Sequence, residues 1–268
     1  MPVMATAAAF FDLDRTLISG ASAFPFAVEA WRQGLASPGE IARWSTAALS
    51  FFIAGDKGGD TSSHIRGEFL TKIEGATVDD LDLVGQTVLP KLVSRVRPES
   101  RRLVAMHHEA DRDTWIVSAS PRRIVEPLAA SLGMTGAVGT DGEVEAGRFT
   151  GRLSGPFIYG AGKAQAIEKL AADRGYSLEL SYAYSDSISD LPMMELVGHP
   201  VAVNPDSELG AIARERGWPI VRFAHKTKRV FAFSGVVAAS AVTAGIAYGL
   251  GRRQGRRAAF SGMLRPLR

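Results

Sequence analysis

Acidic residues at alternate positions are the first feature of this chain that could carry chemistry. Asp12 and Asp14 follow an apolar run at residues 5–11, and Thr16 comes two positions later. Two like charges buried together destabilise a fold unless a cation or a proton neutralises them. Taken alone, the pattern indicates either a site that holds a cation or a turn or helix cap after a strand.

A second pair of aspartates follows another apolar run, at residues 182–184. We expect Asp186 at the end of a strand and Asp190 at the start of the next helix, where the helix N-terminus stabilises a carboxylate. A helix cap rich in serine and aspartate is the alternative for this pair alone.

Two further polar residues lie between these aspartate pairs. Ser118 follows the apolar run at residues 115–117, and Lys163 follows a stretch that contains glycine. A hydroxyl beside free backbone N–H groups suits a phosphate oxygen, and a lysine supplies a positive point charge for the same anion. This stretch is not a P-loop, because no glycine lies five positions before Gly162 and Ala164 replaces the serine or threonine of that motif.

Short apolar runs alternate with helix-like segments along most of the chain. This alternation predicts an α/β fold in which helices cover a parallel sheet. In such sheets ligands bind beyond the carboxyl ends of the strands, which is where the aspartates and Ser118 are expected. The predicted strands are 5–11, 115–117, 182–184, 201–203 and 220–223, and the predicted helices are about 98–111, 121–132, 162–174, 188–197 and 206–217.

Residues 19–97 interrupt this alternation. They carry helical patterns punctuated by glycine and proline and show no strand pattern, which predicts an insert of about four helices. Residues 141–153 contain an Asp-Gly pair and further glycines, which predicts a small hairpin.

Composition narrows the classes of function. The chain has 268 residues and no cysteine, which excludes cysteine-ligated zinc, iron–sulfur clusters and thiol catalysis. All 28 acidic residues lie in residues 1–220, whereas residues 221–268 hold ten lysines and arginines and no acid. The chain is therefore an acidic body with a basic tail. The tail is poor in aromatic residues and lacks a nucleic-acid-binding module, so we expect no nucleic-acid partner.

An uncharged segment of 22 residues, 230–251, lies between basic flanks. A bilayer is spanned by about 20 apolar residues, so this segment predicts a single transmembrane helix and a place in the cell membrane. The N-terminus shows no signal-peptide pattern, which predicts a cytoplasmic catalytic domain. The alternatives are a buried helix rich in alanine and glycine, and an interfacial or re-entrant helix, because both flanks are basic. Gly245 and Gly249 form a small-xxx-small pair that would permit a homodimer.

The order of the motifs resembles the haloacid-dehalogenase-like superfamily of phosphohydrolases. An Asp-x-Asp-x-Thr motif, a strand-end serine, a lysine and an Asp-x-x-x-Asp motif follow one another over about residues 7–223. The insert directly after the first motif, together with the stretches 116–121 and 186–192, is similar to subfamily IB, the branch that contains phosphoserine phosphatases.

The resemblance implies a fold and a division into domains. The fold would be α/β, with a doubly wound, Rossmann-like parallel sheet, a helical cap inserted into it and a hydrophobic helix near the end of the chain. The implied domains are a catalytic core at 1–18 and 98–225, a cap at 19–97, a transmembrane helix at 230–251 and a basic tail at 252–268.

The resemblance also implies a role for each motif residue. Asp12 would attack phosphorus and form an aspartyl-phosphate, and Asp14 would protonate the leaving alcohol and then activate water. Mg²⁺ would neutralise charge between the anionic nucleophile and the anionic phosphate. Its ligands would be Asp12, the main-chain carbonyl of Asp14 and Asp186, with Asp190 in a supporting position. The phosphate-binding residues would be Thr16, Ser118, Ala119 and Lys163.

The sequence says less about the leaving group of the substrate than about the reaction. Phosphoserine phosphatases of this branch hold the substrate ammonium with an acid soon after the first motif, whereas this chain has no acid between Ile18 and Glu29. The small and apolar residues there favour a neutral or apolar leaving group. The first hypothesis is a phosphatase of a small phosphorylated metabolite. The alternatives are a membrane-anchored lipid-phosphate phosphatase, of the lysophosphatidate or phosphatidylglycerophosphate type, and a non-catalytic membrane-anchored regulator.

Overall fold

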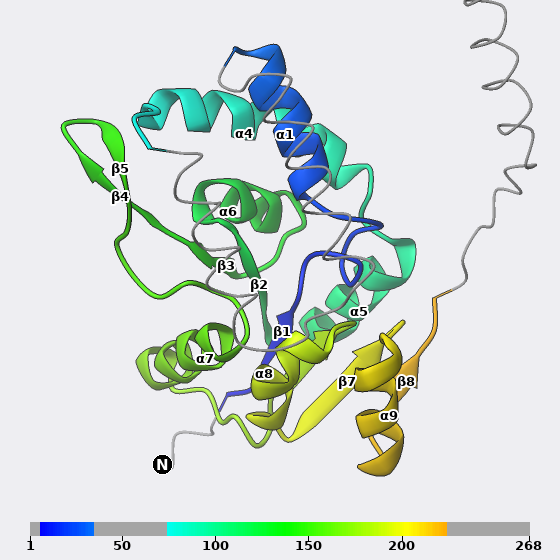
Figure 1. Cartoon of the computed structure of the whole chain (residues 1–268). Helices are drawn as coiled ribbons and strands as arrows, with labels where there is room; N and C mark the ends of the chain where they lie inside the picture. Colours follow the sequence, from blue (N-terminus) through cyan, green and yellow to red (C-terminus); the bar gives the residue numbers. More distant parts are fainter. Residues whose placement is uncertain (1–5, 35–73, 224–268) are drawn as a thin grey trace, which may run out of the picture. The chain divides into compact units, whose positions relative to one another are not determined.

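The structure, a computed structural model, describes residues 6–34 and 74–223. Along these residues strands and helices alternate, apart from successive helices after the first strand and successive strands at residues 136–153 (Figure 1). The predicted membrane segment 230–251, the basic tail and residues 35–73 of the predicted cap lie outside the described residues. Within the described ranges, none of the helices is both long and apolar enough to cross a membrane.

A parallel sheet lies at the centre of the described residues. Its middle strand pairs with a neighbour on each side, so that Phe11 lies opposite Ile116 on one side and opposite Tyr184 on the other. All pairs in this sheet are parallel, so the carboxyl ends of its strands meet at one edge. The sheet contains, in spatial order, β3 (Gly136–Thr140), β2 (Asp113–Pro121), β1 (Ala8–Phe11), β6 (Tyr182–Ser185), β7 (His199–Val203) and β8 (Ile220–Val221).

Helices cover both faces of the sheet. Alternate residues of a strand point to opposite faces, and both sets of side chains are apolar and need to be covered. Ala9 and Phe11 lie in one apolar cluster, and Ala8 and Phe10 lie in another. This burial on two faces confirms the predicted α/β fold with a parallel sheet. The helices that contribute to the first cluster are α4 (Val78–Val93), α5 (Pro98–Glu109) and α6 (Arg122–Ser131), and those that contribute to the second are α7 (Ala161–Arg174), α8 (Leu191–Glu195) and α9 (Ser207–Glu215).

One edge strand, β3, was not predicted from the sequence. Its sequence, GAVGT, is short and holds two glycines, which disfavour strands. In the structure Gly136 lies opposite Trp115 of β2, and a Cβ atom added at Gly136 would lie 2.6 Å from the Trp115 ring. The glycine that weakens the strand pattern is therefore required for close packing against Trp115.

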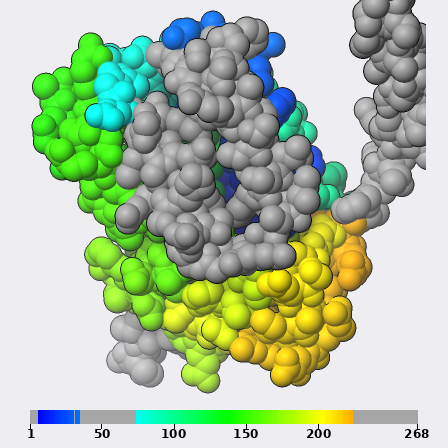
Figure 2. All heavy atoms as spheres, viewed as in Figure 1, coloured from blue at the N-terminus to red at the C-terminus, as the bar shows by residue number. Residues whose placement is uncertain are grey.

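The predicted hairpin at residues 141–153 is present. It consists of β4 (Gly142–Glu145) and β5 (Arg148–Leu153), which pair antiparallel. The main-chain N–H of Phe149 donates to the carbonyl of Ala76, just before α4, at 3.0 Å. Figure 2 shows the hairpin in green beside the start of α4 in cyan. The hairpin therefore supports the second half of the insert.

The insert leaves the core and returns to it along paired main-chain segments. Its first described helix is α1 (Ala23–Arg32), and its last is α4, which packs against both α1 and α6 (Figure 1). The N–H of Ser19 donates to the carbonyl of Arg95 at 2.9 Å, and the N–H of Arg97 donates to the carbonyl of Leu17 at 3.0 Å. This pairing holds both ends of the insert close to the end of β1, where the first aspartate motif lies.

Candidate active site

The predicted catalytic residues meet at the carboxyl edge of the sheet. Asp12 follows β1, Ser118 lies near the end of β2 and Asp186 follows β6, and these three strands are neighbours. The main-chain N–H of Asp12 donates to the carbonyl of Tyr184 at 2.9 Å, which continues the pairing of β1 with β6. The side chains are buried, so polar partners within the protein must satisfy them.

Lys163 joins the two aspartate motifs. Its Nζ donates to Asp12 Oδ1 at 2.6 Å and to Asp190 Oδ2 at 2.8 Å. Ser185 Oγ also donates to Asp190 Oδ2, at 2.7 Å. All four residues are buried. Asp190 therefore positions the lysine against Asp12.

A glycine lets Lys163 reach this position. Gly162 lies in the first turn of α7 and packs against the carbonyl of Phe157, where an added Cβ would lie 1.9 Å from the oxygen. Because the conflict is with main chain, the first turn of α7 can approach the preceding loop only with glycine at this position. Lys163 is the next residue and enters the site from this turn.

Burial and the neighbouring charges shift the pKa values of Asp12 and Lys163. Burial raises the pKa of Asp12 to about 8; the Lys163 charge opposes the rise, and the charges of Asp190 and Asp186 add to it. Burial alone would lower the pKa of Lys163, but the charges of Asp12 and Asp190 outweigh it and the net shift is upward. Lys163 thus stays charged, and its charge favours the ionised form of Asp12 against the effect of burial.

Asp186 has a different cation beside it. Nε and Nη2 of Arg15 both contact Asp186 Oδ2, and Thr16 Oγ1 donates to Oδ1 at 3.4 Å. Burial raises the pKa of Asp186 to about 6 in spite of the Arg15 guanidinium. The hydroxyl of Thr16, a residue expected to bind phosphate, is directed to Asp186. We did not single out Arg15 from the sequence, although it lies inside the first motif.

Asp14 contacts the start of the insert. Its Oδ1 accepts from the main-chain N–H of Ser22 at 2.8 Å, and its Oδ2 accepts from Ser22 Oγ at 3.2 Å. Burial raises the pKa of Asp14, and the two hydrogen bonds from Ser22 oppose the rise. Ser22 Oγ also lies 3.0 Å from Ser120 Oγ, at the end of β2. Neither serine was predicted, although Ser22 lies directly before α1, a position that serine often occupies.

Ser118 and Ala119 lie where β2 leaves regular pairing. The register of β2 against β3 shifts between Val117 and Pro121. Ser118 is buried, and its Oγ accepts from the N–H of Ser120 at 3.2 Å, whereas Ala119 is half-buried. The irregular strand end therefore leaves residues 118–120 outside the regular pairing with β3, at the edge where Asp12 lies.

The donor set fits a hard cation. Among the described residues, no group of three or more histidine, aspartate or glutamate side chains is placed to hold a metal ion. The predicted magnesium ligands are not such a group, because only two of them are side chains. They are the carboxylates of Asp12 and Asp186 and the main-chain carbonyl of Asp14. These are all oxygen donors, which magnesium and calcium prefer. Burial raises the pKa of both carboxyls, and a cation bound between them would favour their charged forms.

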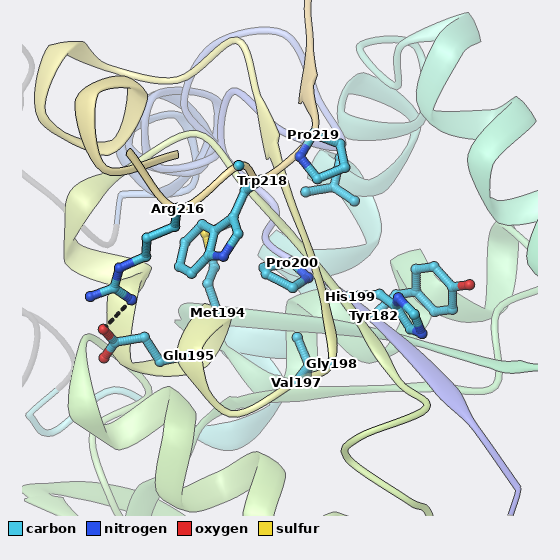
Figure 3. A pocket seen from close by; sticks show the side chains of 12 residues that line it. Tyr182, Met194, Glu195, Val197, Gly198, His199, Pro200, Arg216, Trp218 and Pro219 are labelled. Carbon is cyan, nitrogen blue, oxygen red and sulfur yellow. Dashed lines mark hydrogen bonds and ion pairs between the residues drawn. The ribbon is translucent and has the colours of Figure 1, made fainter. Parts of the chain in front are cut away.

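A cavity of about 590 Å³ lies away from these residues (Figure 3). Its lining includes Tyr182 and His199, at the starts of β6 and β7, whose rings stack with centroids 4.5 Å apart. Arg216 lies 5.1 Å from the centre of the Trp218 ring and pairs with Glu195. The cavity is therefore at the amino-terminal edge of the sheet, and none of the predicted site residues lines it.

His107 is a packing residue. It is fully buried, with its ring 5.9 Å from Phe11 and 4.8 Å from Tyr182, and its Nε2 lies 2.8 Å from the Tyr184 hydroxyl. Burial, with the nearby charge of Arg112, lowers the pKa of His107 to about 4. A neutral imidazole among aromatic rings supports the sheet beneath the site.

Known proteins resemble this chain over most of its length. A probable phosphatase from Mycobacterium tuberculosis is 41% identical over 220 residues, which cover 82% of this chain and 76% of the relative. A phosphoserine phosphatase from the same species is 38% identical over 232 residues, covering 85% and 75%. A histidinol-phosphatase from Neisseria meningitidis is 32% identical over 222 residues, covering 80% and 98%.

The fold and the family agree with these relatives. A crystal structure of a protein of unknown function from Bordetella pertussis has a TM-score of 0.71 and 27% identity, and the match covers 81% of this chain and 99% of that chain. The family model for haloacid dehalogenase-like hydrolases matches residues 9–195, which include every predicted site residue. The resemblance found in the motifs and the predicted enzyme class are thus confirmed. The chain belongs to the haloacid dehalogenase-like hydrolase family.

Proposed function

We propose that the protein is a Mg²⁺-dependent phosphomonoesterase that forms an aspartyl-phosphate on Asp12. The observation that carries the proposal is the Lys163 ammonium, held between Asp12 and Asp190 at 2.6 and 2.8 Å. A buried carboxylate with a fixed cation beside it, at the carboxyl edge of a parallel sheet, is placed to meet an anionic phosphate. Relatives named as phosphatases support the same class of reaction.

Asp12 supplies the nucleophile. Its carboxylate attacks phosphorus, the bond from phosphorus to the leaving oxygen breaks, and the phosphoryl group moves to Asp12. Lys163 already contacts Asp12, so its charge lies where negative charge develops on the transferring group. Bound Mg²⁺ would supply further positive charge, with Asp12, the carbonyl of Asp14 and Asp186 as the residues that hold it.

Asp14 acts as the general acid and then as the general base. Its raised pKa favours the protonated form that donates a proton to the leaving alcohol. The resulting carboxylate then accepts a proton from the water that hydrolyses the aspartyl-phosphate. The N–H and Oγ of Ser22 hold the Asp14 carboxyl group in one orientation for both steps.

Ser118, Ala119 and Lys163 bind the transferring group. The hydroxyl of Ser118 and the main-chain N–H groups at the irregular end of β2 donate to phosphate oxygens. Lys163 adds a charge-assisted hydrogen bond. Because these groups come from a strand end and the first turn of a helix, their positions depend on the core and not on the substrate.

The leaving group is a small neutral alcohol. The one acid of α1, Glu29, is buried and accepts from Lys91 Nζ at 2.7 Å, and the Lys91 hydrogen bond holds the pKa of Glu29 below its usual range. Glu29 is thus already paired and does not offer a carboxylate to a substrate ammonium. The relatives are named for different substrates, phosphoserine and histidinol phosphate, so their names do not decide between leaving groups.

A phosphate-release assay tests this function. The full-length protein is incubated with Mg²⁺ and a panel that contains phosphoserine, histidinol phosphate, sugar phosphates, glycerol phosphate and lipid phosphates. We expect release of phosphate from at least one small phosphomonoester, and loss of that release in excess EDTA. Release that persists in EDTA would contradict the magnesium requirement. No release from any member would favour the non-catalytic regulator.

A lipid phosphate is the second candidate substrate, and one sequence feature favours it. The uncharged segment 230–251 would anchor the protein in the cell membrane and hold the catalytic residues near lipid head groups at its cytoplasmic face. Flotation of the full-length protein with vesicles after a high-salt wash tests the anchor. Activity on lysophosphatidate or phosphatidylglycerophosphate, with none on soluble esters, would support this candidate over the first.

A further inference from the structure

We infer that Arg15 is the counter-ion that Mg²⁺ replaces on Asp186, so that Arg15 sets how tightly this protein binds the metal. The inference rests on the magnesium site of the proposed function. It adds to that site a residue outside the predicted ligands.

Both oxygens of Asp186 are engaged in the structure. Nε and Nη2 of Arg15 contact Oδ2, and Thr16 Oγ1 donates to Oδ1 at 3.4 Å. The Asp186 side chain is 5% exposed, whereas the Arg15 side chain is 36% exposed. A cation that binds Asp186 through Oδ2 must therefore take over the oxygen that the guanidinium contacts, and the Arg15 side chain is exposed enough to turn towards solvent.

The main chain at Arg15 gives independent support. Its φ is 61°, in the left-handed region that glycine adopts freely and that other residues rarely adopt. Its N–H donates to the carbonyl of Gly20 at 3.1 Å, which closes the turn after β1. Glycine would fill this turn without strain, so the turn by itself does not require arginine. The contact of the side chain with Asp186 is one function that glycine at this position could not supply.

The neighbouring charges explain why Asp186 needs a cation of its own. Asp186 and Asp190 are both buried, and Lys163 makes its hydrogen bonds with Asp12 and Asp190. Of the cationic residues in the described part of the chain, Arg15 is the one that the structure shows in contact with Asp186. A guanidinium that contacts a carboxylate through two nitrogens competes with a metal for it. The apparent affinity for Mg²⁺ then equals the intrinsic affinity multiplied by the fraction of molecules in which Asp186 is free of Arg15.

Two full-length variants separate this effect from a general change in charge. Arg15→Asn removes the guanidinium and places a residue that tolerates left-handed backbone. Arg216→Gln is the matched control, because it removes the same charge and an ion pair, with Glu195, at the opposite edge of the sheet. Both are stripped with EDTA and dialysed. Calorimetric titration with MgCl₂ then gives the Kd, and thermal unfolding in EDTA gives the Tm of the metal-free protein.

We expect Arg15→Asn to bind Mg²⁺ about five- to fiftyfold more tightly than the wild type. Its metal-free Tm should be lower, because Asp186 has lost its cation. Arg216→Gln should keep the wild-type Kd for Mg²⁺. An unchanged or weaker affinity in Arg15→Asn, or an equal gain in Arg216→Gln, would overturn the inference and leave the proposed function standing. No Mg²⁺ binding in any of the three proteins would overturn the magnesium site and the inference with it.

Discussion

Lys163 Nζ lies 2.6 Å from Asp12 Oδ1, although 151 positions separate the two residues in the chain. Both side chains are buried, and Asp190 receives a second hydrogen bond from the same ammonium at 2.8 Å. The pairing of β1 with β6 brings the two aspartate motifs to one edge, and the first turn of α7 supplies the lysine. The fold thus places a cation beside the proposed nucleophile before any substrate binds.

Replacing Lys163 by methionine should destabilise the protein by about 3–5 kcal/mol, because two carboxylates would remain buried without their shared cation. Urea denaturation of the metal-free protein measures the loss. Lys169→Met is the matched control in the same helix, since Lys169 is 77% exposed and pairs with the exposed Asp173. Its cost should stay below about 0.5 kcal/mol. Equal losses in the two variants would contradict the buried role of Lys163.

Replacing Asp12 by asparagine should lower kcat by about 10³-fold or more, because the amide oxygen cannot replace the carboxylate as a nucleophile. The fold should survive, since asparagine has the same shape and Lys163 keeps its contact with Asp190. Phosphate release and thermal unfolding are measured on the same preparation. Wild-type turnover in Asp12→Asn would show that another residue attacks phosphorus.

Replacing Ser22 by alanine should affect substrates according to their leaving group. Asp14 keeps one hydrogen bond, from the Ser22 N–H, and loses the one from Oγ, so proton donation becomes less well oriented. We expect kcat to fall about tenfold for an alkyl phosphate, whose alkoxide must be protonated, and about twofold or less for p-nitrophenyl phosphate.

Two controls accompany this prediction. Ser22→Thr restores the hydroxyl and should recover activity on the alkyl phosphate. Ser94→Ala removes an exposed hydroxyl that bonds the carbonyl of Lys91, and it should change neither rate. Equal losses on alkyl and aryl substrates in Ser22→Ala would indicate a structural role alone for this serine.

Stability should fall in acid because of His107. Burial lowers its pKa from 6.5 to about 4, so the unfolded chain binds this proton at a higher pH than the folded chain does. The contribution of His107 is complete above pH 6.5 and is lost as the pH falls towards 4, by about 3 kcal/mol in total. Urea denaturation between pH 7.5 and pH 4.5 should show a smaller slope in His107→Gln.

Much of the site could be predicted because its motifs are local. An apolar run followed by Asp12 specifies a buried strand with a carboxylate at its end, and the same holds for Asp186. Alternating strands and helices then imply a parallel sheet, and a parallel sheet places all such ends at one edge. The position of Ser118 near the end of β2 follows from the same rule, whereas Lys163 comes from the first turn of α7.

Contacts between distant segments could not be predicted in this way. The hydrogen bonds from Ser22 to Asp14 depend on how the insert rejoins the core beside Arg95, and nothing in the stretch around Ser22 encodes that pairing. β3 was missed because Gly136, which makes room for the Trp115 ring, weakens the local strand pattern. Here packing between strands overrides local propensity.

By itself, the sequence determined the order of most of the core elements, though not β3, together with the residues able to do chemistry and the edge at which they meet, since periodicity and strand-end position are local properties. Only the tertiary structure decided which cation pairs with which carboxylate. Lys163 contacts Asp12 and Asp190, and Arg15 contacts Asp186, because only the assembled sheet brings these side chains within hydrogen-bonding distance in a buried environment. Burial makes those pairings matter, since a carboxylate removed from water depends on the cation beside it.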